Sequence, residues 1–278
     1  MEKATKGKTL YVSDLDGTLL NNSVEISDFS VKAINSLVEK GMIFSYATAR
    51  SRYTSSRLTK SLITDTPAVI YNGTFVYDIK NEKRIISNDF SQADVQKILD
   101  RLLKNGTHPM IHAYLGEEEK YIINESKMSR GMADFQSKRE LDERRTPVDV
   151  YDLAPYCVFY FTCIDEESKL LPLYNELKEE YQCLYTKDIY SGDYWLEIQP
   201  NRATKASAIR ELKELLGCDR VVCFGDGTND IPMFQYADEA YAVANAHPEL
   251  KKYATAIIDS NENDGVARWL LKNYKTTD

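Results

Sequence analysis

The sequence predicts an α/β fold with a Rossmann-like parallel-sheet core and an inserted α+β cap domain. Apolar, strand-like runs alternate with helix-patterned segments up to about residue 71 and again after residue 190. Two of these runs pass directly into glycine and aspartate, which is where an open parallel sheet places its binding site. Residues 84–190 follow a mixed order of helices and strands instead. We therefore expect a discontinuous core of residues 1–83 and 191–278, with residues 84–190 as the cap.

The first strand and the first helix follow from local patterns. The apolar run 10–13 stops at Asp14, and its lack of alternation is typical of a strand that is buried on both faces. Apolar residues then recur at helical spacing over 27–40, and Gly41 can cap the helix that they predict. This order of strand and crossover helix favours a parallel sheet.

Two further strands and a hairpin complete the first core segment. The run 42–47 predicts a second strand, which leads into a hydroxyl and a guanidinium at Thr48 and Arg50. The run 66–71 predicts a third buried strand. Asn72-Gly73 follows it and precedes β-forming residues, so the chain should turn back on itself as a hairpin.

The insert and the second core segment are less regular. The clearest strand of the insert is the β-rich run 156–164, and leucines at helical spacing after residue 170 predict a covering helix. The charged stretch 137–145 is interpreted as a solvated loop or helix face. Alternation then resumes with a strand at 194–198 and a helix at 205–216, before the strand that begins near Val221.

Composition excludes several classes of protein. The chain has 278 residues and a formal net charge of −8, and no basic stripe stands out, which argues against a nucleic-acid partner. The five cysteines lack CxxC spacing and are interpreted as reduced core residues. We find no signal peptide and no apolar stretch of membrane-spanning length, so we expect a cytoplasmic protein with small ligands and no membrane partner. The sequence leaves the oligomeric state open.

The first strand ends in two aspartates that need a cation. Asp14 and Asp16 stand two positions apart and Gly17 follows them. Two unit charges about 4 Å apart repel by roughly 4 kcal/mol at an effective dielectric constant near 20. A bound metal ion would remove this repulsion. The alternative is a plain turn, because Asp and Gly are ordinary turn residues.

Three more groups follow in order along the chain. Thr48 ends the second strand, Lys205 begins an apolar-periodic helix, and a second strand-glycine-acid segment carries Asp226 and Asp230. Helix capping is the structural alternative for Thr48 and for the later acids. Four such motifs in order, all at strand or helix ends, favour chemistry over capping.

This order of motifs resembles the haloacid dehalogenase-like superfamily, specifically its Cof-type phosphatases of subclass IIB, with a large cap between the second and third motifs. The resemblance covers essentially the whole chain and implies a Mg²⁺-dependent phosphatase. By resemblance, Asp14 is the nucleophile that becomes an aspartyl-phosphate, and Asp16 is the general acid and base. Thr48 would hydrogen-bond the transferring phosphoryl group, and Lys205 would offset its charge.

The resemblance also implies the metal ligands. Asp14, Asp226 and the backbone carbonyl of Asp16 would hold Mg²⁺, which prefers oxygen ligands and keeps several waters. Asp230 would be either a direct ligand or a residue that supports the metal's water shell and Lys205. Ala49 and Ala206 stand where many relatives have glycine, but neither change removes a charged or hydroxyl group.

The substrate is less well specified. Arg50 and Asn72 are expected to contact it, because they lie at the ends of the predicted core strands. Asn229 is expected either to cap a helix or to donate to the phosphoryl group. The resemblance favours a small phosphorylated metabolite, most of all a sugar phosphate. A sugar phosphomutase that uses the same aspartyl-phosphate is the main alternative, and a non-catalytic sugar-phosphate sensor is another.

Overall fold

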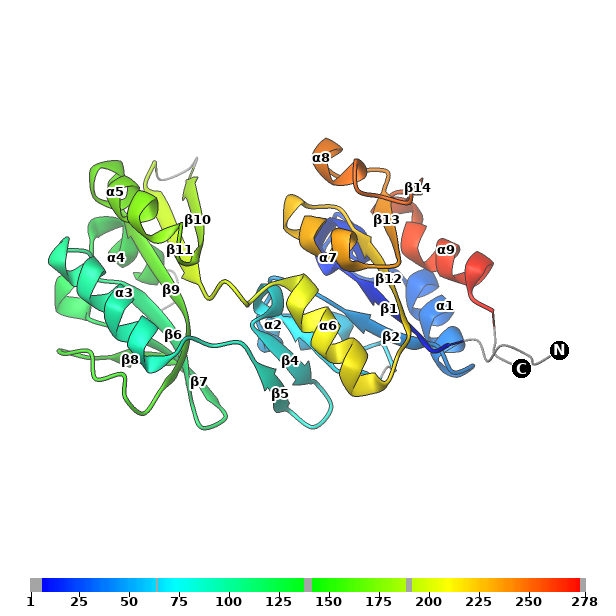
Figure 1. Cartoon of the computed structure of the whole chain (residues 1–278), viewed down its shortest axis with the longest axis horizontal. Helices are drawn as coiled ribbons and strands as arrows, with labels where there is room; N and C mark the ends of the chain where they lie inside the picture. The colour runs from blue at the N-terminus through cyan, green and yellow to red at the C-terminus, as the bar shows by residue number, and fades with distance from the viewer. Residues whose placement is uncertain (1–6, 64, 138–141, 189–191, 276–278) are drawn as a thin grey trace. The chain divides into compact units, whose positions relative to one another are not determined.

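The computed structural model describes residues 7–63, 65–137, 142–188 and 192–275. By its internal contacts the chain divides into two units. The core unit comprises residues 1–87 and 203–278, and the insert unit comprises residues 88–202. Figure 1 shows the elements of both units in chain order.

A five-stranded parallel sheet forms the centre of the core unit, in the order β14-β13-β12-β1-β2. Its strands are β1 (Thr9–Ser13), β2 (Ile43–Tyr46), β12 (Arg220–Gly225), β13 (Glu239–Val243) and β14 (Ala256–Ile258). β1 lies in the middle of the three that carry the motifs, with β2 on one side and β12 on the other. Leu10, Val12 and Phe224 are fully buried, as expected for strands covered on both faces.

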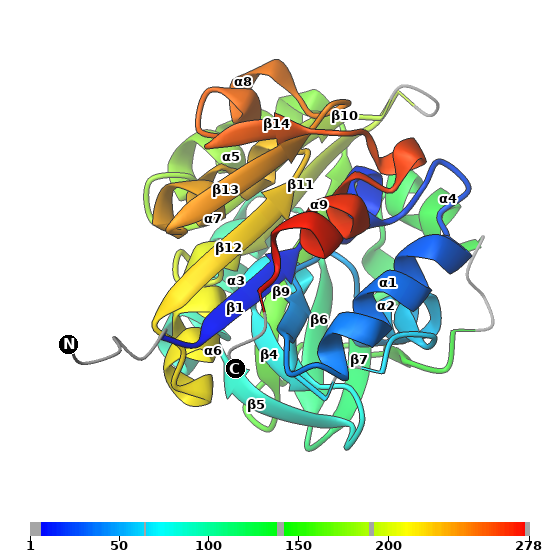
Figure 2. The ribbon, with the colours of Figure 1, turned by 90° about the vertical axis from the view of Figure 1, so that its right-hand side faces the viewer.

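Helices cover both faces of this sheet. They are α1 (Asp28–Val38), α2 (Arg52–Thr59), α6 (Lys205–Leu216), α7 (Ile231–Tyr236), α8 (Pro248–Lys251) and α9 (Gly265–Asn273). Figure 2 shows α1 and α9 on the face of the sheet that is turned toward the viewer. They pack against each other, as α6 and α7 do. The predicted α/β fold class with an inserted domain is confirmed.

A small antiparallel sheet holds the predicted hairpin. It consists of β3 (Ala68–Ile70), β4 (Phe75–Asp78) and β5 (Lys83–Ser87). β3 and β4 pair antiparallel on either side of Asn72, which has a positive φ of 54°. An isolated bridge between Ala47 and Val69 joins β3 to the chain just after β2.

The insert unit is built on a six-stranded sheet of order β10-β11-β9-β6-β7-β8. Its strands are β6 (Met110–Leu115), β7 (Glu118–Ile123), β8 (Arg145–Pro147), β9 (Cys157–Asp165), β10 (Gln182–Lys187) and β11 (Tyr194–Gln199), and its helices are α3 (Gln92–Lys104), α4 (Arg130–Ser137) and α5 (Glu167–Leu177). One face packs Phe161 and Leu196 against Ile98 and Leu173 in a single apolar cluster.

The division into units differs from the expected boundaries of residues 83 and 191. β11, which we expected in the core, pairs antiparallel with both β9 and β10, and this places it in the insert sheet. The first unit accordingly extends to residue 87 and resumes at residue 203. The hydrophobic pattern of β11 suits a strand of either sheet, because it does not specify a partner.

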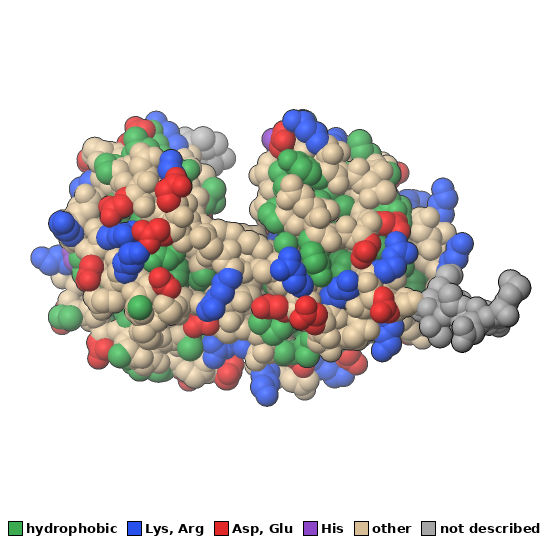
Figure 3. Space-filling model, viewed as in Figure 1, with side chains coloured by type: hydrophobic (Ala, Val, Ile, Leu, Met, Phe, Trp, Pro, Cys, Tyr) green, Lys and Arg blue, Asp and Glu red, His purple; other side chains and the backbone are tan. Residues whose placement is uncertain are grey.

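The surface agrees with the charge balance of the sequence. Acidic and basic side chains are mixed on the face that Figure 3 shows, without a basic stripe. In the charged stretch 137–145, residues 138–141 lie outside the described residues, whereas Arg144 is half-buried and pairs with Glu119 and Asp142. All five cysteines are free. None of the helices within the described ranges is long and apolar enough to span a membrane.

Candidate active site

The site begins at the carboxyl end of β1, where the backbone turns sharply. The amide of Asp14 still donates to the carbonyl of Phe224 on β12 at 2.9 Å, and a helical turn over Leu15–Leu19 follows at once. Gly17 within this turn has φ +71°, and a Cβ atom there would lie 2.3 Å from the Asp226 carboxylate. Glycine therefore allows both the turn and the close approach of β12, as the sequence predicts.

Lys205 joins the ends of β1 and β12. It is the first residue of α6, which Thr204 caps by accepting from the amide of Ser207. Its Nζ lies 2.5 Å from Oδ1 of Asp14 and 2.6 Å from Oδ1 of Asp230. All three side chains are buried. The lysine therefore bridges two carboxylates away from water, where charge-assisted bonds are strong.

Carboxylates outnumber the ammonium in this cluster. Asp14, Asp226 and Asp230 each offer an oxygen, and these three atoms lie within 4.8 Å of one another. Burial, with the charges of Asp230 and Asp226, raises the pKa of Asp14 to about 7 despite the opposing charge of Lys205. Burial and the charge of Asp230 raise the pKa of Asp226 to about 6. Such an excess of buried negative charge and hard oxygen donors fits a divalent cation.

Asp230 serves the loop as well as the lysine. Its Oδ2 accepts from the backbone amides of Asp226 and Gly227, both at 3.0 Å, while Oδ1 accepts from Lys205. Both of its oxygens are thus occupied by nitrogen donors. Asp230 precedes α7 but makes no side-chain capping bond to it. The geometry therefore favours the supporting role for Asp230 over direct metal ligation. The bond from the Gly227 amide also caps the short helical turn Thr228–Asp230, so the capping alternative holds for that turn beside the contact with Lys205.

Asp16 is held by Arg50. The guanidinium forms two bonds to the carboxylate, Nε to Oδ2 at 2.8 Å and Nη2 to Oδ1 at 2.5 Å. The side chain of Arg50 is 28% exposed and that of Asp16 is 48% exposed, so the pair is open to water. This bond raises the pKa of Arg50. Arg50 thus binds the expected general acid in this structure, and its contact with a substrate stays a prediction.

Thr48 lies in the loop after β2, next to the small sheet. Its amide donates to the carbonyl of Val69, and its carbonyl accepts from the amide of Asn72, both at 2.9 Å. Its hydroxyl oxygen accepts from the amide of Arg50 at 3.1 Å. The cap of α2 is Ser51, so the alternative that Thr48 is a helix cap is wrong.

Asn72 and Asn229 meet at the same edge of the sheet. Nδ2 of Asn229 donates to Oδ1 of Asn72 at 3.2 Å, which joins the loop after β3 to the loop after β12. The structure thus brings these two predicted substrate residues together. Their contact with a substrate stays a prediction.

Two supporting residues were missed by the sequence reasoning. The Thr18 hydroxyl donates to Oδ1 of Asp226 at 3.3 Å, and Asn245 donates to the carbonyl of Gly17 at 2.7 Å. Thr18 adjoins the first motif and could have been found there as a hydroxyl on the turn. Asn245 follows β13 without any distinctive pattern, so no sequence signal marks it.

Known proteins of similar sequence and structure cover almost the whole chain. A proposed phosphatase of Buchnera aphidicola subsp. Baizongia pistaciae (strain Bp) is 29% identical over 270 residues, which cover 95% of this chain and 98% of that protein. A 5-amino-6-(5-phospho-D-ribitylamino)uracil phosphatase of Bacillus subtilis (strain 168) is 26% identical, with 92% and 95% covered. The crystal structure of a haloacid dehalogenase-like hydrolase from Bacteroides thetaiotaomicron matches with a TM-score of 0.74, 24% identity and coverage of 96% and 100%.

The family assignment rests on a family model that covers nearly the whole chain. The family model of haloacid dehalogenase-like hydrolases matches residues 11–270, which include every motif described above. The fold of the solved relative agrees with it. The chain therefore belongs to the haloacid dehalogenase-like hydrolases.

Proposed function

We propose that this phosphatase hydrolyses phosphate monoesters of small metabolites, chiefly sugar phosphates, with Mg²⁺ and through an aspartyl-phosphate. The observation that carries the proposal is the buried Asp14–Lys205 pair beside Asp226 at the carboxyl ends of β1 and β12. The relative from Bacillus subtilis supports the substrate class, because its name describes a phosphorylated ribityl compound. Five free cysteines support a cytoplasmic location.

Asp14 is the nucleophile in this mechanism. Lys205 holds its Oδ1, so Oδ2 attacks phosphorus while the bond from phosphorus to the leaving oxygen breaks. The lysine ammonium offsets the charges of the carboxylate and of the phosphoryl oxygens. The aspartyl-phosphate is a mixed anhydride, which water then cleaves at phosphorus to regenerate Asp14 and release phosphate.

Asp16 moves the protons of both steps. It donates a proton to the departing oxygen and then takes one from the attacking water. Arg50 positions the Asp16 carboxyl through its two hydrogen bonds, and it must release at least one oxygen for the transfer. The hydroxyl of Thr48 donates to a phosphoryl oxygen, while Asn72 and Asn229 contact the substrate.

The carboxylates fit Mg²⁺ by their number, burial and oxygen chemistry. Asp14, Asp226 and the main-chain carbonyl of Asp16 would hold the ion, and Asp230 would support the site through Lys205 and the loop. When bound, Mg²⁺ supplies positive charge that neutralises the phosphoryl group.

Phosphate release tests the proposal. The assay compares wild type with Asp14→Asn on a panel of sugar, polyol and nucleoside monophosphates, with Mg²⁺ or with chelator. We expect release that requires both the metal and Asp14, and a ranking that identifies the substrate class. No release from a folded wild-type protein would refute the hydrolase reading. Isomerised product that depends on a bisphosphate activator would then point to a mutase.

The role of Asp16 has a separate test. Asp16→Ala should still react with an activated aryl phosphate, since that leaving group needs little acid assistance, but the adduct should persist. Intact mass spectrometry would then show the chain with one added phosphoryl group. If the variant turns over without an adduct, Asp16 is not the general base.

A further inference from the structure

A cavity of about 660 Å³ opens at the amino ends of the core strands. The end of α9 lines it, together with the first residues of four strands: Thr9 of β1, Ile43 of β2, Arg220 of β12 and Glu239 of β13. The carboxylates of the active site lie at the opposite ends of these strands. Strands of five or six residues span about 17–20 Å, so the cavity is separate from the active site.

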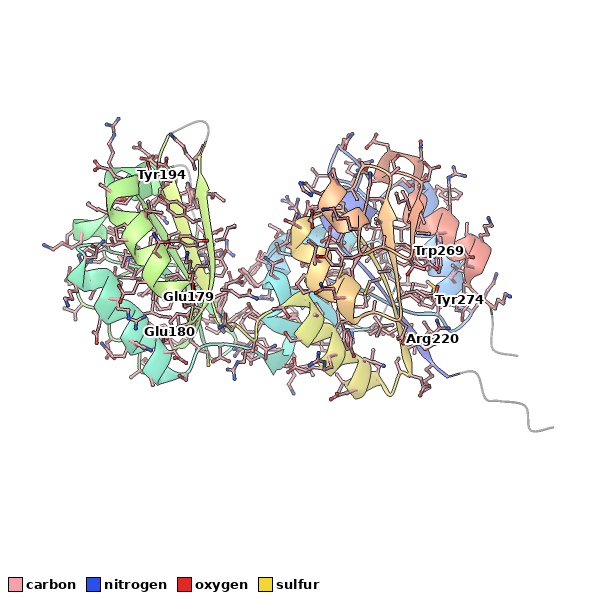
Figure 4. All side chains as sticks on the ribbon, turned by 45° about the horizontal axis from the view of Figure 1, so that its top comes forward. Glu179, Glu180, Tyr194, Arg220, Trp269 and Tyr274 are labelled. Carbon is pink, nitrogen blue, oxygen red and sulfur yellow. The ribbon has the colours of Figure 1, made fainter. Side chains whose placement is uncertain are left out.

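Aromatic side chains form much of the cavity wall. Tyr241 and Trp269 pack with ring centroids 4.3 Å apart, and Tyr11 and Tyr274 form an edge-to-face pair at 6.0 Å. Figure 4 labels Trp269 on α9 and Tyr274 just beyond its end. The Tyr274 hydroxyl donates to the carbonyl of Lys40 at 3.2 Å, which fixes its ring. Fixed rings present flat surfaces on which a planar ligand can stack.

The charged groups of the cavity are mostly cationic. Its only carboxylate among the described lining residues is Glu239, which pairs with Arg220 and accepts from the Tyr241 hydroxyl. The other charged lining residues are Lys8, Lys272 and Lys275. Within the described part of the chain, no carboxylate lies in ion-pair range of these three ammonium groups. This local excess of positive charge occurs in a chain of net charge −8.

We propose that this cavity is a second binding site, and that its ligand is a planar aromatic anion of about the size of a mononucleotide. The volume lies within the range of roughly 300–1,000 Å³ that small-molecule sites occupy. The rings supply stacking contacts, and the three lysines supply the charge that an anionic group requires. The site is independent of the phosphatase chemistry, because it contains none of the residues of that mechanism.

Tryptophan fluorescence can report on this site alone. The chain has two tryptophans, and Trp195 lies on β11 of the insert unit. A Trp195→Phe variant therefore leaves Trp269 as the reporter. We would titrate it with 3′,5′-cyclic AMP in the presence of chelator, since this phosphodiester is not a phosphate monoester. We expect saturable quenching, with adenosine at least tenfold weaker and inorganic phosphate without effect.

Charge variants complete the test. Lys272→Ala combined with Lys275→Ala should weaken cyclic AMP binding at least tenfold, which corresponds to about 1.4 kcal/mol of lost charged contact. The matched control is Lys104→Ala, which removes a lysine from the last turn of α3 in the other unit. Quenching that persists unchanged in the double variant would overturn the proposal. So would an absence of saturable quenching, or equal quenching in a Trp269→Phe protein that reports from Trp195.

Discussion

Replacing Lys205 by methionine isolates the buried charge cluster. Methionine keeps most of the volume of the side chain but removes the ammonium that binds both Asp14 and Asp230. The two carboxylates are only 7% and 0% exposed, so water cannot replace the lost bonds. Breaking a buried ion pair by removing one partner costs about 3–5 kcal/mol. We expect a loss of this size in the free energy of unfolding at pH 7.5.

Chemical denaturation followed by circular dichroism measures this loss. In chelator at pH 7.5, the denaturant concentration at the midpoint should fall strongly. In a thermal melt, a loss of 3–5 kcal/mol corresponds to a decrease of about 6–20 °C in Tm for domains of 150–250 residues. At pH 5 the loss should be smaller, because Asp14 then takes up a proton and no longer needs a counter-charge. Phosphate release should be abolished at both pH values.

The control uses the same helix. Lys213→Met changes a lysine in the last turn of α6 and should alter stability by less than about 0.5 kcal/mol, as surface substitutions usually do. Adding Asp230→Asn to Lys205→Met should recover part of the stability by removing one unpaired carboxylate. A loss below 1 kcal/mol at pH 7.5, or an equal loss at pH 5, would refute the reasoning.

Two further predictions concern pH and backbone geometry. Burial raises the pKa of Asp14 to about 7 and that of Asp226 to about 6, above their ordinary value of 3.8, so their contribution to metal-free stability is complete below about pH 4 and is lost as the pH rises through 6 and 7. We therefore expect the Tm of wild type minus the Tm of Asp14→Asn, both measured in chelator, to decrease as the pH is raised from 5 to 8. A difference that stays constant over this range would contradict the prediction. Gly73 has φ +104°, and a Cβ atom there would lie 2.0 Å from the carbonyl oxygen of Thr204. Gly73→Ala should thus lower the free energy of unfolding, measured by urea denaturation, by at least about 2 kcal/mol. The control Gly106→Ala, where φ is +70° and the Cβ atom would meet open space, should lower it by about 1 kcal/mol. Equal losses in the two variants would exclude the backbone clash as the cause.

Structural features that depend on a few adjacent residues could be predicted from the sequence. The turn after Asp14 follows from Gly17, and the hairpin between β3 and β4 follows from Asn72-Gly73, because each depends on local backbone conformation. The convergence of Asp14 and Asp226 could also be expected, since the carboxyl ends of parallel strands meet at one edge. The role of Lys205, which begins α6, was implied by the family resemblance alone.

Features that depend on distant partners could not be predicted. The strand β11 suits either sheet, and only its pairing with β9 and β10 decides its place. The bidentate bond between Arg50 and Asp16 depends on the reach of a long side chain across the site, which spacing along the chain does not encode. Asn245 supports the turn at Gly17 from a loop that carries no motif of its own.

The discontinuous core has a consequence for synthesis on the ribosome. β1 lies between β12 and β2 in its sheet, yet β12 is translated far later than β1. The bonded residues Lys8 and Asp219, which precede these two strands, are 211 positions apart in sequence. At about 5–20 residues per second, the intervening segment takes about 10–40 s to emerge. The insert unit, which is continuous in sequence, is complete before β12 appears. During that interval β1 exposes an unpaired apolar edge, so chains that stop before β12 should aggregate or remain bound to chaperones.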